Sequence, residues 1–154
     1  MKKFYSLLFF ALFFITDDFA QTAISPVAGG NFDMGNTLAE NGWTAVNSSA
    51  NQWVVGTKTR YSAPNSAYIS VSGTVDDYSY DNTTAHISHF YQKITLPAEA
   101  FNIKLTFELN GNYQFDANGF LQDGFEIFAD PSLVAPVADQ LPGGSAPYHG
   151  SIIQ

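Results

Sequence analysis

The chain has 154 residues, a formal net charge of −8 and no cysteine. This length suffices for one domain with a hydrophobic core, and the acidic balance excludes nucleic acid and anionic membranes as natural partners, since phosphate groups would be repelled. Without cysteine, packing alone or a bound cation must hold the fold together.

Residues 1–20 predict a signal peptide. Lys2 and Lys3 precede an apolar run over residues 4–15, and Ala20 stands before the expected cleavage point. A run of this length is shorter than the roughly 20 residues that a membrane helix needs. We therefore expect no transmembrane segment and a secreted or cell-surface protein, whose residues 21–154 form a single domain.

The rest of the chain alternates apolar and polar residues with a period of two, which favours strands over helices. The clearest example is residues 101–109, in which every second residue is Phe, Ile or Leu. Pro, Gly and Asn separate the segments and favour turns between them. The predicted strands are residues 24–27, 43–46, 52–55, 66–71, 87–96, 101–109 and 124–129.

Short strands separated by turns, with no helix, predict an all-β fold in which two antiparallel sheets form a β-sandwich. The stretch after Asp130 is rich in Pro, Gly and Ala, and residues 151–154 read like the start of another strand. We therefore expect a sandwich truncated at its C-terminal strands, with downstream domains of a longer chain as partners.

Three motifs in the first half of the chain resemble a known group of modules. They are Asn31-Phe32-Asp33 with Gly42-Trp43, then residues 52–56, then residues 61–69. Together they resemble the front half of galactose-binding-like jelly rolls, a group that includes MAM-type domains, carbohydrate-binding modules and cleaved-adhesin modules. Residues 89–97 also resemble a strand in N-terminal modules of long Bacteroidota surface proteins. The resemblance implies a jelly roll that binds ligands or mediates adhesion outside the cell.

A structural calcium ion is also implied by this resemblance. In such modules the acid after Phe, here Asp33, often contributes to a calcium site. Calcium takes six to eight oxygen ligands, and Asn31, Asp76 and Asp77 are further candidates. The alternative is that Asp33 only caps a turn.

The second acidic cluster is Asp116-Ala117-Asn118-Gly119, followed by Asp123 and Glu126. Phe120 and Ile127 occupy positions where a calcium-binding helical loop needs oxygen ligands. This cluster is therefore predicted to be a solvated hairpin loop.

Residues 76–82 are the candidate ligand site, with Tyr78, Tyr80, Asp81 and Asn82 as its binding residues. Tyrosine rings stack on the apolar faces of sugars, while carboxylates and amides bond to sugar hydroxyls, so the set suits a glycan. The alternative is an ordinary exposed loop. Two further aromatics, Trp43 and Trp53, are predicted to be buried in the core rather than to bind sugar.

No catalytic residues are predicted. His86 and His89 are three apart, which places them on opposite faces of a strand, and no nucleophile or zinc motif is present. We expect a non-catalytic extracellular binding or adhesion module that recognises a glycan or a surface protein. The alternatives are an accessory domain of a secreted hydrolase and a structural spacer.

Overall fold

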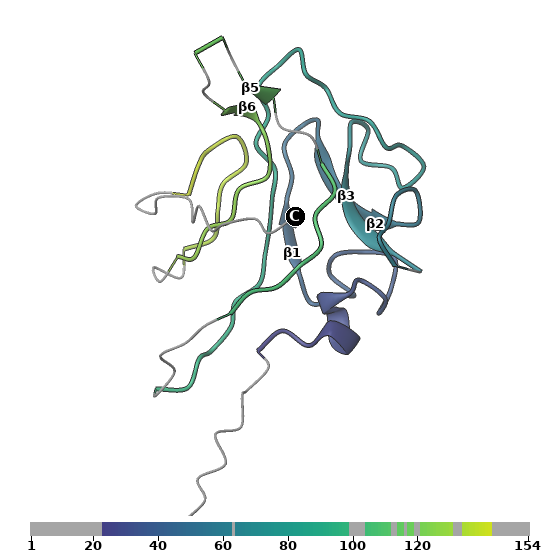
Figure 1. The fold of residues 1–154 in the computed structure, drawn as a ribbon, viewed down its shortest axis with the longest axis vertical. Coiled ribbons are helices and arrows are strands. Elements are labelled where there is room, and N and C mark those ends of the chain that lie inside the picture. Colours follow the sequence, from purple (N-terminus) through teal and green to yellow (C-terminus); the bar gives the residue numbers. More distant parts are fainter. Residues whose placement is uncertain are drawn as a thin grey trace, which may run out of the picture.

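The computed structural model describes residues 23–62, 64–98, 104–111, 114–115, 117–118, 121–130 and 134–142. The predicted signal peptide, residues 1–20, lies outside these ranges. The regular elements are η1 (Pro26–Gly30), β1 (Thr44–Val46), β2 (Gln52–Gly56), β3 (Ser66–Ser70), β4 (His89–Tyr91), β5 (Gln114–Phe115) and β6 (Leu121–Asp123) (Figure 1). Over the described ranges, no helix has the length and hydropathy that would be needed to cross a bilayer.

In the part of the chain that the structure describes, all strand pairs are antiparallel, and they form three two-stranded sheets. β1 pairs with β4, β2 pairs with β3 in a five-residue ladder, and β5 pairs with β6. The structure therefore confirms the predicted all-β fold with antiparallel strand pairs.

Several predicted strands are found close to their expected positions. β1, β2 and β3 match the predictions for residues 43–46, 52–55 and 66–71, whereas β4 covers only three residues of the predicted 87–96. The predicted hairpin loop also lies where expected, because Ala117 and Asn118 form an exposed turn between β5 and β6.

The strand prediction for residues 24–27 is wrong. The turn η1 begins at Pro26, and Gly29 has a φ of 96°, a left-handed conformation that ends any extended run. Gly29 is also buried, and a Cβ at this position would lie 2.2 Å from the carbonyl oxygen of Asn41. Here the chain forms a turn in which the backbone of Gly29 packs closely against that of Asn41, and not a strand.

The predictions for residues 101–109 and 124–129 are also wrong in the part that the structure describes. Residues 104–109 and 124–129 are assigned no strand, and Leu105 is 54% exposed. Alternation defines an apolar face, but a strand also needs a partner for its backbone groups. Residues 101–103 lie outside the described ranges.

A cluster of aromatic rings joins the two larger sheets, with Phe90 of β4 at its centre. The Phe90 ring lies 4.7 Å from that of Trp53, 5.1 Å from that of Trp43 and 6.2 Å from that of Phe32. The three contacts are edge-to-face, the arrangement that aromatic quadrupoles favour. Trp53 belongs to β2, so this cluster ties the β1–β4 sheet to the β2–β3 sheet.

Both tryptophans lie in this aromatic cluster, but each is half-buried, whereas the sequence predicts buried core residues. Their indole N–H groups are bonded to backbone: that of Trp43 donates to the Gly29 carbonyl at 3.1 Å, and that of Trp53 donates to the Ser88 carbonyl at 3.0 Å. Trp53 also contacts Phe125 at 6.0 Å, which extends the cluster to the segment after β6.

An asparagine side chain occupies part of the edge of β2 that does not face β3. The backbone N–H of Trp53 donates to Oδ1 of Asn47 at 2.9 Å, and Nδ2 of Asn47 donates to the Trp53 carbonyl at 3.3 Å. The amide thus pairs with Trp53 as a neighbouring strand would, and it links the end of β1 to β2.

Because Phe90 lies at the centre of the cluster, we expect its ring to contribute most to the packing between the two sheets. We predict that Phe90→Ala lowers the free energy of unfolding by about 3 kcal/mol, because a half-buried ring and three ring contacts are lost. Urea unfolding measures this change. Tyr61→Ala is the control, since that side chain is 81% exposed, and its effect should stay below about 0.5 kcal/mol. Equal effects of the two substitutions would contradict the central role of Phe90.

Candidate ligand-binding loop

Residues 76–82, called the tyrosine loop below, follow β3 and present two aromatic side chains to solvent. Tyr78 is 51% exposed and Tyr80 is 49% exposed, and Asn82 is exposed as well. Three of the four predicted ligand residues therefore lie together at the surface. Whether these three side chains have fixed positions depends on the hydrogen bonds made by the backbone and side chains of the loop.

Asp77 organises the start of the tyrosine loop. Its Oδ2 accepts hydrogen bonds from the Ser72 hydroxyl at 3.0 Å and from the Ser72 backbone N–H at 3.2 Å. Its Oδ1 accepts a hydrogen bond from the Ser79 hydroxyl at 2.5 Å. These bonds, that of Ser79 above all, lower the pKa of Asp77. The carboxylate therefore stays ionised and fixes the backbone on both sides of itself.

Asn51 anchors the end of the loop. Its Oδ1 accepts the backbone N–H of Asp81 at 2.6 Å, and its Nδ2 donates to the Asp81 carbonyl at 2.7 Å. Asn51 has a φ of 54°, a left-handed conformation that asparagine tolerates better than most residues. Asparagine therefore suits this position both by its backbone conformation and by its amide.

The Asp81 side chain acts within the loop rather than toward solvent. Its Oδ1 accepts hydrogen bonds from the Thr83 hydroxyl at 2.6 Å and the Thr83 backbone N–H at 2.8 Å. These bonds lower the pKa of Asp81. Asp81 is thus a positioning residue for the loop, whereas Tyr78, Tyr80 and Asn82 are exposed to solvent.

Tyr68 of β3 packs against the middle of the tyrosine loop. It is only 4% exposed, and its ring meets that of Tyr78 edge-on, at 5.9 Å and 87°. Burial raises the pKa of the Tyr68 phenol, which keeps it protonated and able to donate to the Val75 carbonyl at 2.5 Å. Tyr78 is therefore held by a core residue while half of its surface stays exposed.

Two hollows lie beside the loop. A cleft of about 510 Å³ has Trp43, Trp53 and Val75 among its lining residues. A smaller hollow of about 260 Å³ is lined in part by Asn65 and Asp76. Asp76, the first residue of the tyrosine loop, thus borders a concave and partly polar surface.

Three of the predicted calcium residues make hydrogen bonds to other groups of the chain. Asn31 and Asp33 lie together, with Nδ2 of Asn31 donating to Oδ2 of Asp33 at 2.8 Å, and Oδ1 of Asp33 accepts the backbone N–H of Asn65 at 3.2 Å. Asp77 is bound by serine hydroxyls, as described above. Within the described ranges, no three Asp, Glu, His or Cys side chains gather in a way that could hold a metal ion. Calcium binding stays a prediction.

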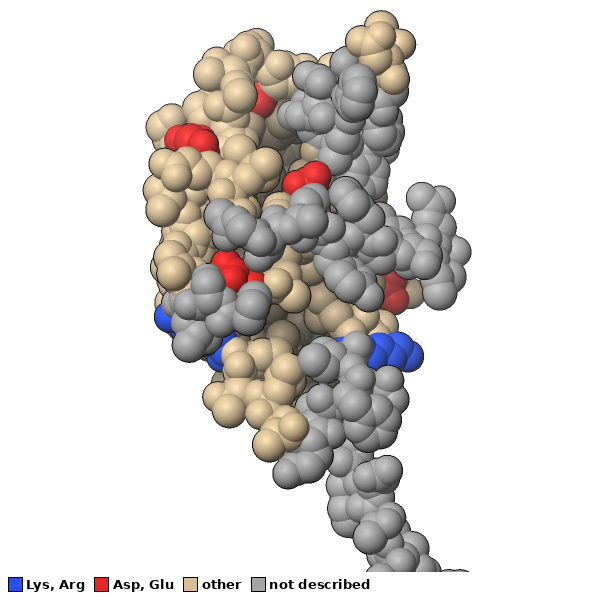
Figure 2. Space-filling model, turned by 90° about the vertical axis from the view of Figure 1, so that its left-hand side faces the viewer, with Lys and Arg blue, Asp and Glu red and all other residues tan. Residues whose placement is uncertain are grey.

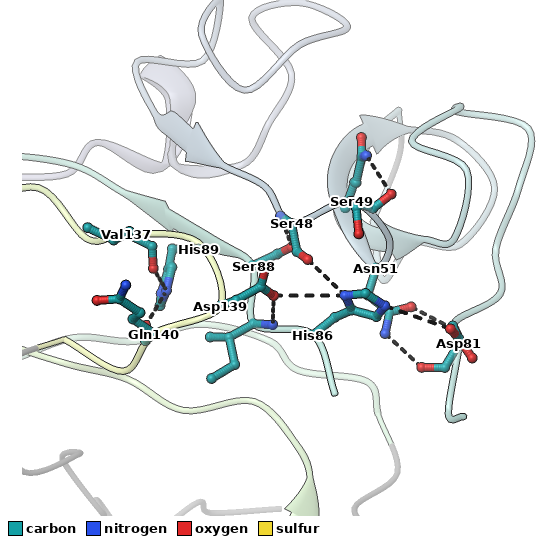
Figure 3. Close-up of polar contacts among 12 residues, drawn as sticks. Ser48, Ser49, Asn51, Asp81, His86, Ser88, His89, Val137, Asp139 and Gln140 are labelled. Atoms are coloured by element: carbon teal, nitrogen blue, oxygen red, sulfur yellow. Dashed lines mark hydrogen bonds and ion pairs between the residues drawn. The ribbon is translucent and has the colours of Figure 1, made fainter. Parts of the chain in front are cut away.

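A polar network behind the loop was not predicted from the sequence. His86 lies between Asp81, Ser48 and Asp139, which come from three different segments (Figure 3). Ser48 is 38 residues from His86 along the chain, and Asn51 is 30 residues from Asp81. No local pattern signals such pairs, because each depends on the tertiary fold.

Charge is spread unevenly over the surface. On the face shown in Figure 2, acidic side chains are scattered over the molecule, whereas the few basic ones lie toward its lower end. This agrees with the net charge of −8.

No family model, curated protein or solved structure matches this chain. The assignment of the site therefore depends on the geometry of the loop.

The Asn51 amide should contribute measurably to stability, because it makes two backbone hydrogen bonds to the tyrosine loop. We predict that Asn51→Gly, which preserves the left-handed backbone, lowers the free energy of unfolding by about 1–2 kcal/mol in urea. The control is Asn82→Gly in the same loop, where no amide pairing of this kind is seen and the loss should be smaller. A larger loss for Asn82→Gly would show that Asn51 is not the anchor.

Proposed function

We propose that this protein is a non-catalytic extracellular binding module that recognises a glycan through its tyrosine loop. The observation that carries the proposal is the loop itself: Tyr78 and Tyr80 are each about half exposed on a segment that is tied down at both ends by Asp77 and Asn51. Exposed aromatic rings on a fixed backbone lose little conformational entropy on binding.

The chemistry of the loop suits a sugar. A tyrosine ring offers an apolar face for the C–H groups of a pyranose, and its hydroxyl can exchange hydrogen bonds with a sugar hydroxyl. Asn82 adds an amide with donors and an acceptor, and Asp76 adds a carboxylate at the edge of the smaller hollow. A surface protein is the alternative partner for the same side chains.

The arrangement of Ser48 and His86 supports binding rather than catalysis. Ser48 Oγ lies 2.8 Å from Nδ1 of His86, which is the distance between a nucleophile and its base. Ser48 is however only 5% exposed, and its side chain also bonds to Asp139. A buried hydroxyl with internal partners cannot reach a substrate, so this pair is assigned a structural role.

Two further proposals concern the setting of the module. The β1–β4 and β2–β3 sheets, joined by the Phe90 cluster, would be the two layers of a jelly-roll sandwich of the galactose-binding-like kind. The signal-like residues 1–20 support export, so that the module would act in a secreted or cell-surface protein. An accessory role beside a hydrolase and a purely structural role are the alternatives, and the second predicts no ligand.

Substitution of the exposed ring tests the site. We predict that Tyr80→Ala weakens binding to a glycan identified on a microarray by about tenfold or more, because a stacked tyrosine is a typical binding hot spot. The melting temperature should change by less than about 2 °C, since Tyr80 is half exposed.

Tyr61→Ala serves as the matched control, because it removes an even more exposed tyrosine outside the loop. It should leave the affinity unchanged. Unaltered binding by Tyr80→Ala would refute the site, and a wild-type protein that binds no glycan would refute the ligand class.

A further inference from the structure

Residues 104–109 have the sequence of a strand but no partner strand in the described part of the chain. They alternate Lys, Thr and Glu with Leu, Phe and Leu, and all six are exposed. No bend or turn interrupts the segment, which runs as an extended connection toward β5 (Figure 1). Among the described residues, no hydrogen bond involves its backbone. Extended backbone with unpaired N–H and C=O groups is a template for pairing with another strand.

The apolar side chains of this segment are open to solvent. Leu105 is 54% exposed, Phe107 is 43% exposed and Leu109 is 37% exposed. The segment is nevertheless attached to the rest of the fold, because the Phe107 ring lies 5.8 Å from that of Phe125, which in turn lies 6.0 Å from that of Trp53. It therefore presents apolar surface and unpaired backbone from a place that is anchored to the aromatic cluster.

The order of charges along the segment is complementary to itself. Lys104 precedes Thr106 by two residues, and Glu108 follows Thr106 by two. When two copies pair antiparallel about Thr106, each Lys104 lies opposite a Glu108, and each Leu105 lies opposite a Phe107. Opposite charges, apolar pairs and threonine pairs are all favourable across a ladder. The alternation of the sequence also keeps each pair on a single face of the ladder.

Other arrangements of two copies lack this match. A parallel pair in register places Lys104 opposite Lys104 and Glu108 opposite Glu108, which is unfavourable. Antiparallel pairing about Leu105 or about Phe107 leaves both charged side chains opposite uncharged ones. A shift by one residue places apolar side chains opposite polar ones. The charge order therefore favours antiparallel pairing about Thr106, with a second copy of this chain as the partner.

We propose that residues 104–109 are a self-association edge, through which two copies of this chain pair antiparallel about Thr106. Both copies use the same edge, so the pairing is two-fold symmetric and closes at a dimer. The ladder is short and each chain carries a net charge of −8, so the dimer forms at high protein concentration rather than as an obligate assembly. Self-association does not depend on the proposed function, but a dimer carries two tyrosine loops and would bind a repeating glycan with greater avidity.

Charge reversal tests the pairing by sedimentation velocity, at protein concentrations up to about 0.5 mM, where weak dimers are populated. The wild-type chain should form a dimer whose share rises with concentration. Lys104→Glu and Glu108→Lys should each weaken the dimer about tenfold or more, because both ion pairs become repulsive contacts. Lys58→Glu is the matched control, since it changes the net charge as much as Lys104→Glu at an exposed lysine outside the segment. It should leave the dimer almost unchanged.

Two combinations of these substitutions should restore the pairing. The double variant Lys104→Glu with Glu108→Lys again places opposite charges together, so it should dimerise like the wild type. An equimolar mixture of the two single variants should form a heterodimer, because one copy then carries two glutamates and the other two lysines. A wild-type chain that stays monomeric, a dimer that both single variants leave intact, or a loss that neither combination restores would overturn the proposal.

A single introduced cysteine locates the symmetry axis, since the chain has none of its own. Pairing about Thr106 brings two Thr106→Cys thiols together, because opposite Cα atoms lie about 5 Å apart, within the range of a disulfide. Asn110→Cys is the control: Asn110 follows Thr106 by four residues, so its two copies lie eight positions apart along the ladder, about 27 Å. Under mild oxidation, Thr106→Cys should form a linked dimer about tenfold faster or more than Asn110→Cys. Equal rates would overturn pairing about Thr106.

Discussion

The edge-to-face contact between Phe90 and Trp53, at 4.7 Å, is the interaction on which the rest of this structure depends. Each sheet in the described residues has only two strands, and an isolated two-stranded sheet is marginally stable in water. Partial burial of the aromatic cluster adds hydrophobic free energy to these short ladders. Because Phe90 belongs to β4 and Trp53 to β2, the same contact also sets the position of one sheet against the other.

Hydrogen bonds from side-chain amides connect the sheets to each other and to the tyrosine loop. Asn47 pairs with the backbone of Trp53, and Asn51 pairs with that of Asp81 in the same two-bond manner. Both asparagines lie in the short connection between β1 and β2, so the start of the strand that contains Trp53 is linked both to the end of β1 and to the tyrosine loop. The tyrosine loop, which is the proposed recognition surface, is in this way connected to the aromatic cluster, although its own tyrosines are half exposed.

Much of the strand pattern could be predicted from the sequence, but long-range pairings could not. β2 and β3 were predictable because alternation, β-branched residues and flanking turns agree, and the exposed tyrosines followed from their polar surroundings. Residues 104–109 carry the clearest alternation and yet form no strand, since alternation does not provide a partner. Asn51, His86 and Asp139 were missed because at least one partner of each lies 30 or more residues away in the sequence.

The central claim is that the tyrosine loop is a preorganised surface rather than a flexible connection. Backbone ¹⁵N relaxation by NMR tests this claim most directly, because it reports motion residue by residue on the fast timescale at which loops lose order. We predict order parameters for residues 77–82 of about 0.85, equal to those of β2 and β3. Values below about 0.6 in the loop, with rigid strands beside it, would contradict the account.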